Sequence, residues 1–511
     1  MLAKIKSSAV VGVDALPVTV EVDISFGLPA FSTVGLAEGA VRESRERVKA
    51  AIRNSGYDFP NRRITVNLAP ADVKKEGAGY DLPMALGILA ASEILRSEKL
   101  EHFGVIGELS LDGSIRPAKG ILPMAIAAQK AGLEGILVPL DNAEEAAVVA
   151  GIKIIGIKTL YEAVEFLLGA RVLHPTTVNL HSIFQNNANY NLDFDEVKGQ
   201  EHVKRAMEIA AAGGHNILMK GPPGSGKTMM ARRLPTILPD LTFEEALETT
   251  KIYSVMGMLK NHTPLLSARP FRAPHHTISD AGLIGGGQTP KPGEVSLAHN
   301  GVLFLDESPE FKKNVLEVLR QPLEDGMVTI SRATGSLSFP SRFILVIAFN
   351  PCPCGYRGDM KHNCRCTPTQ VQRYESRLSG PLLDRIDMHL EVPSVPYKEM
   401  ASGDCGESSS AIKKRVEQSR ALQKKRFAKR KNFYCNGQMS PKDLKKFCSL
   451  DKASDKLIAD AVDRLGLSAR SYHRILKIGR TIADLERKES LQAKHIAEAI
   501  QYRRLDRAKR Y

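Results

Sequence analysis

The sequence predicts a multidomain α/β protein that ends in an all-helical region. Residues 1–172 alternate β-branched runs with helical stretches, and residues 193–395 form a second α/β block. From residue 411 to residue 511 the pattern is helical throughout. At about 150 residues per domain, 511 residues make several domains that can each bury a core.

The elements follow from local patterns. Continuous or alternating β-branched runs predict strands at 64–70, 102–111, 134–140 and 153–157, and longer apolar stretches predict helices at 84–95 and 121–132. The Asn-rich, aperiodic stretch 173–192 reads as a linker, and small residues interrupt the pattern at 403–411. The expected domains are therefore 1–172, 193–395 and 403–511.

Composition excludes several classes of protein. A hydrophobic content of 43% and a charged content of 25% are those of a globular chain, not a disordered one. No apolar run reaches the roughly 20 residues of a membrane-spanning helix, and Asp14 interrupts the apolar stretch near the N-terminus. We expect a cytoplasmic protein without a membrane partner. The 71 Lys and Arg against 57 Asp and Glu, a net charge of +14, favour a polyanionic partner.

A nucleotide site is indicated by Gly221–Thr228, which matches G-x-x-x-x-G-K-[ST] between an apolar strand and a helix. Its glycines let backbone N–H groups surround phosphates at a helix N-terminus. Lys227 is expected to reach the β- and γ-phosphates, and the Thr228 hydroxyl to bind Mg²⁺ beside ATP. The expected nucleotide contacts here are Gly221, Pro222, Pro223, Gly224, Ser225, Gly226, Lys227, Thr228 and Met229.

Two later strands bring further polar residues. The apolar stretch 300–305 ends in Asp306, expected to hold Mg²⁺, and Glu307, expected to polarise the attacking water. The strand 343–351 ends in Asn350, which can orient that water. Arg385 in SGPLLDRID fits an arginine finger directed at a neighbouring subunit, and the alternative is a pairing with Asp384 or Asp387.

Together with DEVKGQEHVKRAM (195–207) and RPFRAPHHTISDAGLIGGG (269–287), these motifs resemble the AAA+ ATPases of the magnesium-chelatase-like branch, and along the whole chain the ComM/YifB family. The resemblance implies an AAA+ core, a helical lid and a homo-hexamer with its sites between subunits. It further implies that Val197, Gly199 and Gln200 line the adenine pocket, and that Arg470 is the sensor-2 arginine that contacts the γ-phosphate.

The resemblance also implies an ATP-dependent helicase that promotes branch migration during recombination in natural transformation. Its partners would be single-stranded or branched DNA, bound without sequence preference, and recombination proteins. Two alternatives stay open. The same motor class includes protein-remodelling ATPases, and the chelatase branch includes regulatory subunits.

The segment 105–146 resembles the proteolytic domain of the Lon protease, which uses a Ser-Lys dyad. The stretch that matches the family serine, 76–81, contains no Ser, and Leu122 stands where the family has its Lys. We therefore expect a Lon-like domain without peptidase chemistry, serving ring assembly or DNA guidance. A rearranged pair of Ser110 and Lys119 is the alternative.

Four cysteines cluster in the pattern C-x-C-x₉-C-x-C. Four thiolates so close together suit tetrahedral Zn²⁺, and a cytoplasmic location argues against disulfides. A structural zinc is the interpretation we favour over a reduced cluster without metal or a redox site. The expected ligands are Cys352, Cys354, Cys364 and Cys366.

Residues 327–343 alternate as in a β-hairpin, and Arg332 near its tip is a candidate contact for DNA phosphates. A second candidate is the loop at His275 and His276, which could equally be a packed structural loop. Residues 413–431 hold ten basic residues against Glu417, with Lys413, Lys414 and Arg415 as candidate DNA contacts. The alternative for this run is a solvated helix face.

Overall fold

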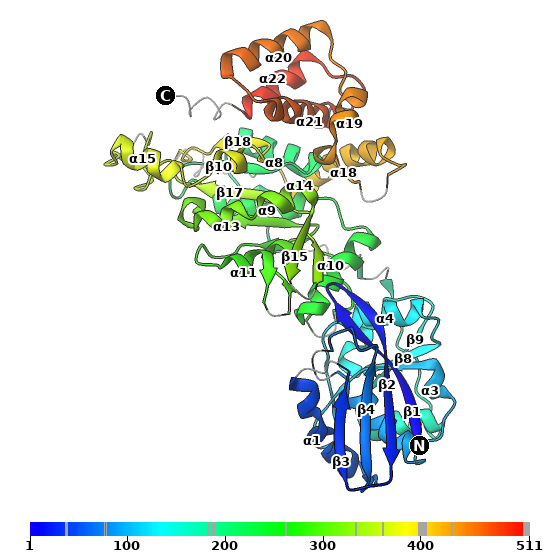
Figure 1. Cartoon of the computed structure of the whole chain (residues 1–511). Helices are drawn as coiled ribbons and strands as arrows, with labels where there is room; N and C mark the ends of the chain where they lie inside the picture. Colours follow the sequence, from blue (N-terminus) through cyan, green and yellow to red (C-terminus); the bar gives the residue numbers. More distant parts are fainter. Residues whose placement is uncertain are drawn as a thin grey trace. The chain divides into compact units, whose positions relative to one another are not determined.

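The computed structural model describes residues 1–35, 39–75, 77, 79–180, 183–184, 190–260, 263–287, 289–332, 335–359, 362–396, 406–430 and 433–503, without the side chains of 39–42 (Figure 1). Outside this range lie Thr334 of the expected hairpin, Glu76 of the stretch that matches the Lon serine, Lys431 of the basic run, much of the linker 173–192, and residues 504–511. The chain forms two compact units: residues 1–187 with 242–267, and residues 188–241 with 268–511.

The first unit is built on a seven-stranded mixed sheet with the order β3-β4-β2-β1-β5-β8-β9. The two longest strands, β1 and β2, pair in antiparallel fashion from Leu2↔Asp23 to Val11↔Asp14. Valines of β2 alternate toward the interior, as the period of two requires. The strands are β1 (Leu2–Val11), β2 (Asp14–Ser25), β3 (Ala30–Val34), β4 (Arg63–Ala69), β5 (Phe103–Val105), β8 (Gly135–Pro139) and β9 (Lys153–Ile157).

Helices cover this sheet. α2 is buried on almost every side, and a Cβ on its Gly87 would lie 2.6 Å from Cγ2 of Val22, so glycine permits the close contact with β2. The helices are α1 (Gly39–Asn54), α2 (Asp81–Ala91), α3 (Lys99–His102), α4 (Ile121–Lys130), α5 (Ala143–Ala146) and α6 (Leu160–Leu168). The expected strands and helices are all present, except that 102–111 divides into β5 and β6 (Glu108–Leu109), the latter paired with β7 (Ile115–Arg116).

One helix of the first unit comes from a distant part of the chain. α10 (Phe243–Met256) follows the nucleotide-binding segment in sequence but packs in the first unit, against α4. The N–H of Gly120 donates to the carbonyl of Ser254 at 2.9 Å, and Lys251 forms an ion pair with Asp14. Sequence patterns placed this segment inside the ATPase core and gave no signal for its packing.

The second unit contains a parallel five-stranded sheet with the order β11-β14-β17-β10-β18. Alternate residues of its central strands enter two cores: Val346 and Ala348 face one, and Leu345 and Ile347 face the other. Burial on both faces explains why these strands read as continuous apolar runs. The strands are β10 (Ile217–Lys220), β11 (Phe271–Arg272), β14 (Val302–Leu305), β17 (Ile344–Phe349) and β18 (Met388–Glu391).

Helices flank this sheet and form the region beyond it. The described part of 406–503 contains helices and no strand, as the pattern predicts. Its apolar residues join the core that also contains α8 and α9, so the helical region and the sheet share one interior. The main helices are α8 (Glu201–Gly213), α9 (Lys227–Ile237), α14 (Arg320–Asp325), α15 (Pro368–Glu375), α16 (Gly380–Leu383), α18 (Ser409–Arg426), α19 (Pro441–Phe447), α20 (Lys452–Leu465), α21 (Ala469–Leu485) and α22 (Ala493–Gln501). Among the described helices, none has both the length and the apolarity needed to cross a membrane.

Candidate nucleotide site and cysteine centre

The phosphate loop runs from the end of β10 to the first turn of α9. Gly224 and Gly226 have φ of 73° and 86°, conformations that favour glycine. A Cβ on Gly221 would lie 2.1 Å from the carbonyl oxygen of Val392, so this position also requires glycine. The loop therefore presents its backbone at the N-terminus of α9, the geometry that binds phosphate.

The Lys227 ammonium lies inside this loop. Its Nζ donates to the carbonyls of Gly221 and Pro222, each at 2.8 Å, and to Oδ1 of Asn350 at 3.2 Å. Burial lowers the pKa of Lys227, while the charges of Asp306 and Glu307 oppose that shift. Asn350 at the end of β17 is thus joined to the phosphate loop, as its place at the strand tip predicts.

Thr228 and Asp306 meet at the end of β14. The Thr228 hydroxyl donates to Oδ2 of Asp306 at 2.7 Å, across 78 residues of sequence. Both groups are the oxygen ligands that Mg²⁺ prefers, so they fit the ion that the resemblance implies. Glu307 is exposed beside them with φ of 47°, and its N–H donates to Oδ1 of Asp306 at 2.9 Å. The exposed carboxylate is free to approach a water molecule.

The expected adenine segment is tied to the phosphate loop by Gln200. Its Nε2 donates to the carbonyls of Ser225 at 2.9 Å and Pro393 at 2.8 Å. Gln200 and Gly199 have φ of 54° and 65°, and Val197 is buried, so the chain turns sharply here before α8 begins. The structure thus brings this segment beside the loop that the motif identifies.

The two candidate arginines lie together in a separate cluster. Nη2 of Arg385 pairs with Oε1 of Glu324 at 2.5 Å, and Nη2 of Arg470 lies 3.9 Å from the same oxygen. The alternative interpretation expected Arg385 to pair with Asp384 or Asp387. Its partner is Glu324 instead. Sequence reasoning missed Glu324, because nothing in the chain around it marks a partner 61 residues away.

The four cysteines converge. Sγ of Cys352 lies 3.3 Å from Sγ of Cys354 and 3.6 Å from Sγ of Cys364, and the four ligand atoms, with Cys366, lie within 4.8 Å of one another. Tetrahedral zinc with bonds of about 2.3 Å places its sulfur atoms about 3.8 Å apart, so the set fits Zn²⁺. Backbone N–H groups of Tyr356 and Arg365 lower the pKa of Cys354 to about 6, which favours a thiolate.

This cysteine loop contacts the nucleotide site. Cys352 follows Asn350 by two residues and is fully buried. A Cβ on Gly355 would lie 2.6 Å from Cγ of Pro223, so the cysteine loop packs directly on the phosphate loop. A metal in the cysteine set would therefore fix the chain that carries Asn350.

The expected hairpin is present as β15 (Met327–Arg332) and β16 (Gly335–Pro340), paired from Met327↔Pro340 to Arg332↔Gly335. Hydroxyl pairs cross its exposed part, between Thr329 and Ser338 at 3.1 Å and between Ser331 and Ser336 at 2.9 Å. Arg332 is exposed at the end of β15. The tip thus offers one guanidinium and a row of hydroxyl groups.

The loop at His275 and His276 is held locally. Nδ1 of His275 lies 2.9 Å from the Thr277 hydroxyl, and the centroids of the two histidine rings lie 4.1 Å apart with the rings tilted by 35°. Within the described residues the cysteine set alone gathers three or more potential metal ligands. His275 and Thr277 are exposed, and only the half-buried His276 lies edge-on to the ring of Phe311, so the packed loop and the DNA contact both stay predictions at this position.

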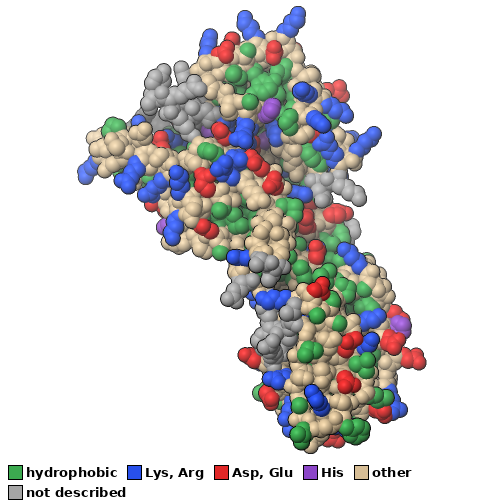
Figure 2. Space-filling view, viewed as in Figure 1, with side chains coloured by type: hydrophobic (Ala, Val, Ile, Leu, Met, Phe, Trp, Pro, Cys, Tyr) green, Lys and Arg blue, Asp and Glu red, His purple; other side chains and the backbone are tan. Residues whose placement is uncertain are grey.

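The basic run lies on α18 up to Arg426 and continues past its end, and much of its charge is already paired. Lys413 contacts Asp240 at 2.6 Å, and Arg415 pairs with both Glu208 and Glu407. Lys414 is exposed, and so are Lys424, Lys425 and Lys429. Figure 2 shows Lys and Arg side chains standing out over the helical region. The exposed lysines, more than Lys413 or Arg415, are therefore available to a polyanion.

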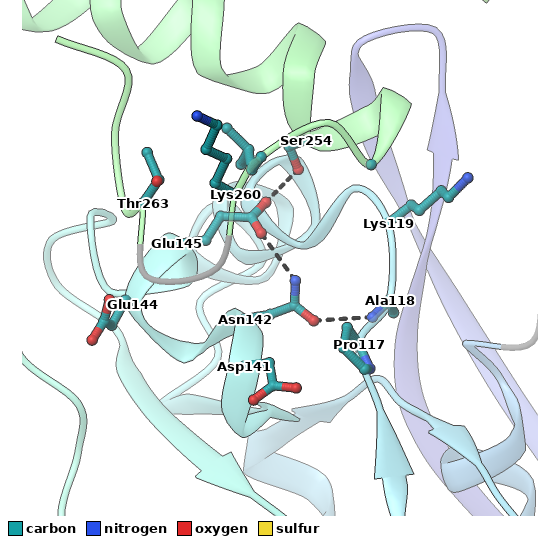
Figure 3. A pocket seen from close by; sticks show the side chains of 12 residues that line it. Pro117, Ala118, Lys119, Asp141, Asn142, Glu144, Glu145, Ser254, Lys260 and Thr263 are labelled. Carbon is teal, nitrogen blue, oxygen red and sulfur yellow. Dashed lines mark hydrogen bonds between the residues drawn. The ribbon is translucent and has the colours of Figure 1, made fainter.

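In the first unit, Leu122 at the family's lysine position and Ser110 of the alternative pair both make structural contacts. Leu122 is fully buried and its N–H donates to Glu145 at 3.0 Å, while Nε of Arg116 donates to the Ser110 hydroxyl at 2.6 Å. Figure 3 shows Glu145 directed at Ser254 and Asn142, with Lys119 pointing away. Burial raises the pKa of Glu145, and hydrogen bonds led by that of Ser254 oppose the shift. The alternative Ser110–Lys119 pair is not formed among these described side chains.

Comparison with known proteins covers nearly the whole chain. Family models described as "Magnesium chelatase, subunit ChlI", "Subunit ChlI of Mg-chelatase" and "Magnesium chelatase, subunit ChlI C-terminal" match residues 193–400, 20–142 and 406–503. The "Competence protein ComM" of Haemophilus influenzae is 46% identical over 99% of this chain and 98% of its own length.

Two further relatives differ in how much of this chain they match. The "Uncharacterized protein YifB" of Escherichia coli is 44% identical over 99% of the chain and 98% of its own length. The "Magnesium-chelatase 38 kDa subunit" of Rhodobacter capsulatus is 27% identical over 31% of the chain and 50% of its own length. The parallel sheet, the phosphate loop, the helical region and the full-length identity agree: the chain belongs to the ComM/YifB family of magnesium-chelatase-like AAA+ proteins.

Proposed function

We propose that the chain is an ATP-dependent DNA motor, a homo-hexameric helicase that promotes branch migration during recombination in natural transformation. The observation that carries the ATPase part is the convergence of Lys227, Thr228, Asp306 and Asn350 at one sheet edge. Family membership implies ATP and Mg²⁺ at this place. The DNA part is supported by the full-length similarity to a competence protein.

The site residues have separate tasks in this proposal. The phosphate loop and Lys227 bind the phosphates, Thr228 and Asp306 hold Mg²⁺, and Glu307 polarises the attacking water. Asn350 orients that water, Val197, Gly199 and Gln200 line the adenine side, and Arg385 and Arg470 stabilise negative charge on the γ-phosphate. Zn²⁺ on the four cysteines would hold the Asn350 segment in place.

DNA contacts are assigned to the β15–β16 hairpin and to exposed lysines of α18. The hydroxyl row and Arg332 suit phosphate oxygens, and the chain contains no Trp to form a stacking platform. Binding is therefore expected to track the backbone, without sequence preference, and to weaken with salt. Such a motor works in the cytoplasm, where ATP and recombination intermediates meet.

A protein-remodelling ATPase is the second candidate, because the same motor also moves polypeptides. It has less support, since the hairpin tip carries hydroxyl groups and a guanidinium and lacks the aromatic residue expected of a polypeptide-gripping loop. A chelatase-type subunit shares the same family models, but the magnesium-chelatase subunit of Rhodobacter capsulatus is only 27% identical over 31% of this chain, against 46% over 99% for the competence protein.

The test is ATP-dependent displacement of a labelled strand from forked and three-stranded DNA. Wild-type protein should displace the strand, and Glu307→Gln should bind ATP without displacement. ATP hydrolysis is measured in parallel with single-stranded DNA and with an unfolded protein. Stimulation by unfolded protein alone would favour the remodelling candidate, and displacement that persists in Glu307→Gln would refute the assignment of the motor site.

A further inference from the structure

We propose that Glu324 is a latch that holds Arg385 and Arg470 away from nucleotide in the resting subunit. Release of the latch presents both arginines to the γ-phosphate bound by a neighbouring copy of the chain. This inference rests on the ATPase function proposed above and adds a positioning residue that controls it.

The resting position of Arg385 is a buried one. Its side chain is 7% exposed, Nη2 is paired with Glu324 at 2.5 Å, and Nη1 donates to the carbonyl of Pro381 at 2.7 Å. Its Nε is buried without a hydrogen-bond partner among the described residues. A guanidinium held in this way cannot reach another subunit, and its unmet donor favours a partner that offers more acceptor oxygens, as a triphosphate does.

The charge balance favours release toward an anion. One carboxylate, 49% exposed, faces two guanidinium groups, because Arg470 lies 3.9 Å from the same oxygen and is 58% exposed. A single negative charge leaves the pair of arginines with excess positive charge, which attracts phosphate. Water reaches the Glu324 side of the ion pair, which weakens the attraction that holds Arg385.

The backbone that carries Arg385 is anchored, so the moving part is the side chain. Nε of Arg474 on α21 donates to the carbonyl of Asp384 at 2.7 Å, and Nη1 of Arg503 donates to that of Ile386 at 2.6 Å. The residues on both sides of Arg385 are thus held by the helical region, which also carries Arg470. The two arginines can respond together to a shift of α21.

The latch also adjoins the hairpin. Glu324 lies on α14, and Met327, the first residue of β15, follows three positions later. Gly326 joins the two elements with φ of 65°. Force on the hairpin therefore reaches Glu324 through a very short connection, which links DNA contact to release of the arginines.

The experiment measures ATP hydrolysis by the full chain with and without single-stranded DNA. Glu324→Gln should raise the basal rate roughly three- to tenfold, as expected for loss of a charge-assisted but partly exposed pair. The additional stimulation by DNA should shrink by a similar factor. Glu324→Asp, which keeps the charge, should restore most of the wild-type behaviour.

Controls separate a latch from a structural role. Glu324→Gln combined with Arg385→Ala should show no gain, because the released group is absent. Glu93→Gln removes a carboxylate of similar exposure, 46%, that also pairs with an arginine, and should hydrolyse ATP like wild type. A basal rate in folded Glu324→Gln that equals or falls below wild type, or a gain that survives Arg385→Ala, overturns the latch.

Failure of the proposed function is distinguishable. If wild-type protein hydrolyses no ATP under any condition, the ATPase assignment fails. Amide hydrogen exchange then decides the latch, since Glu324→Gln should speed exchange in 380–387 relative to wild type and to Glu93→Gln. Unchanged exchange in that segment overturns it.

Discussion

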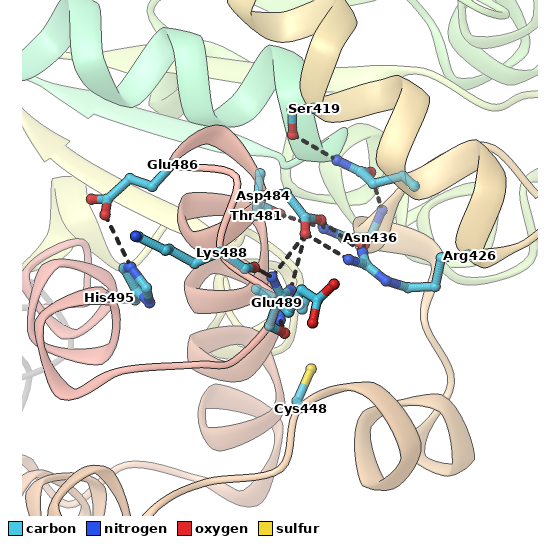
Figure 4. Close-up of polar contacts among 12 residues, drawn as sticks. Ser419, Arg426, Asn436, Cys448, Thr481, Asp484, Glu486, Lys488, Glu489 and His495 are labelled. Carbon is cyan, nitrogen blue, oxygen red and sulfur yellow. Dashed lines mark hydrogen bonds and ion pairs between the residues drawn. The ribbon is translucent and has the colours of Figure 1, made fainter.

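Replacing Asp484 with alanine should destabilise the helical region strongly, because this carboxylate joins three side chains (Figure 4). Asp484 is 1% exposed and accepts two hydrogen bonds from Arg426, at 2.7 and 2.6 Å. It also accepts from Nε of Arg480 at 3.1 Å and Nδ2 of Asn436 at 2.8 Å. Asp484→Ala leaves the Arg480 guanidinium, 2% exposed, without its carboxylate.

The size of the loss follows from burial. Removing one partner of a buried pair costs about 3–5 kcal/mol. The lower end applies here, because Arg480 keeps the carbonyls of Glu489 and Lys488 and Arg426 is 15% exposed. With a urea dependence of about 1–3 kcal/mol per molar, a loss of about 3 kcal/mol lowers the midpoint by roughly 1–3 M.

The assay is urea unfolding followed by far-ultraviolet circular dichroism, with hydrogen exchange to identify α21 as the part that unfolds. Asp484→Asn keeps one acceptor oxygen and should lose less. Asp463→Ala removes an exposed acid of α20 and serves as the matched control. An Asp484→Ala midpoint equal to that of Asp463→Ala would refute the reasoning.

Further predictions concern metal, pH and DNA. Cys352→Ser should lower the zinc content measured by atomic absorption. It should also reduce ATP hydrolysis, because the cysteine loop packs on Pro223 of the phosphate loop. Cys448 lies outside the cluster, so Cys448→Ser should keep the metal. Burial lowers the pKa of His215 to about 4, below the value of about 6.5 expected in the unfolded chain. The unfolded chain therefore binds the proton first, and the stability of the second unit should fall by up to about 3 kcal/mol as the pH drops from 6.5 to 4. In urea titrations, His215→Gln should flatten this dependence of stability on pH. Glu145 has a raised pKa in the folded protein, so the stability of the first unit should decline as the pH rises above about 4.3 and through the folded pKa. Glu145→Gln should remove this dependence of stability on pH. If the dependence is unchanged in that variant, Glu145 is not its cause. Arg332→Ala should weaken DNA binding in a gel-shift series and reduce its dependence on salt by about one phosphate contact, whereas Arg62→Ala in the first unit should change neither.

The nucleotide site could be predicted because each of its parts is local in sequence. A phosphate loop needs eight neighbouring residues, and Asp306 and Asn350 each end an apolar strand. Once the strands are parallel, their carboxyl ends meet at one edge, so Thr228 and Asp306 come together without further information. The same holds for four cysteines within one loop.

Pairings between distant elements could not be predicted. The sequence shows the positive charge of the α18 run, but its partners Asp240 and Glu208 lie on other elements. The sequence therefore predicts more unpaired positive charge on this helix than the structure contains. Glu324 gave no signal for the same reason. The packing of α10 was also missed, because most of its buried residues are polar, such as Glu245, Thr249 and Ser254, so its sequence marks no apolar face that could indicate a partner.

The packing of α10 makes the folding of the first unit depend on a segment that follows the phosphate loop in sequence. Because residues 242–267 leave the second unit and return to it, three separate peptide connections, not one, cross between the units. Removing residues 1–187 would remove α4, against which α10 packs, together with the hydrogen bond from Gly120 and the ion pair with Asp14. The first unit is therefore less a detachable module than a cofolding partner, and a clean deletion must replace residues 242–267 with a short loop as well.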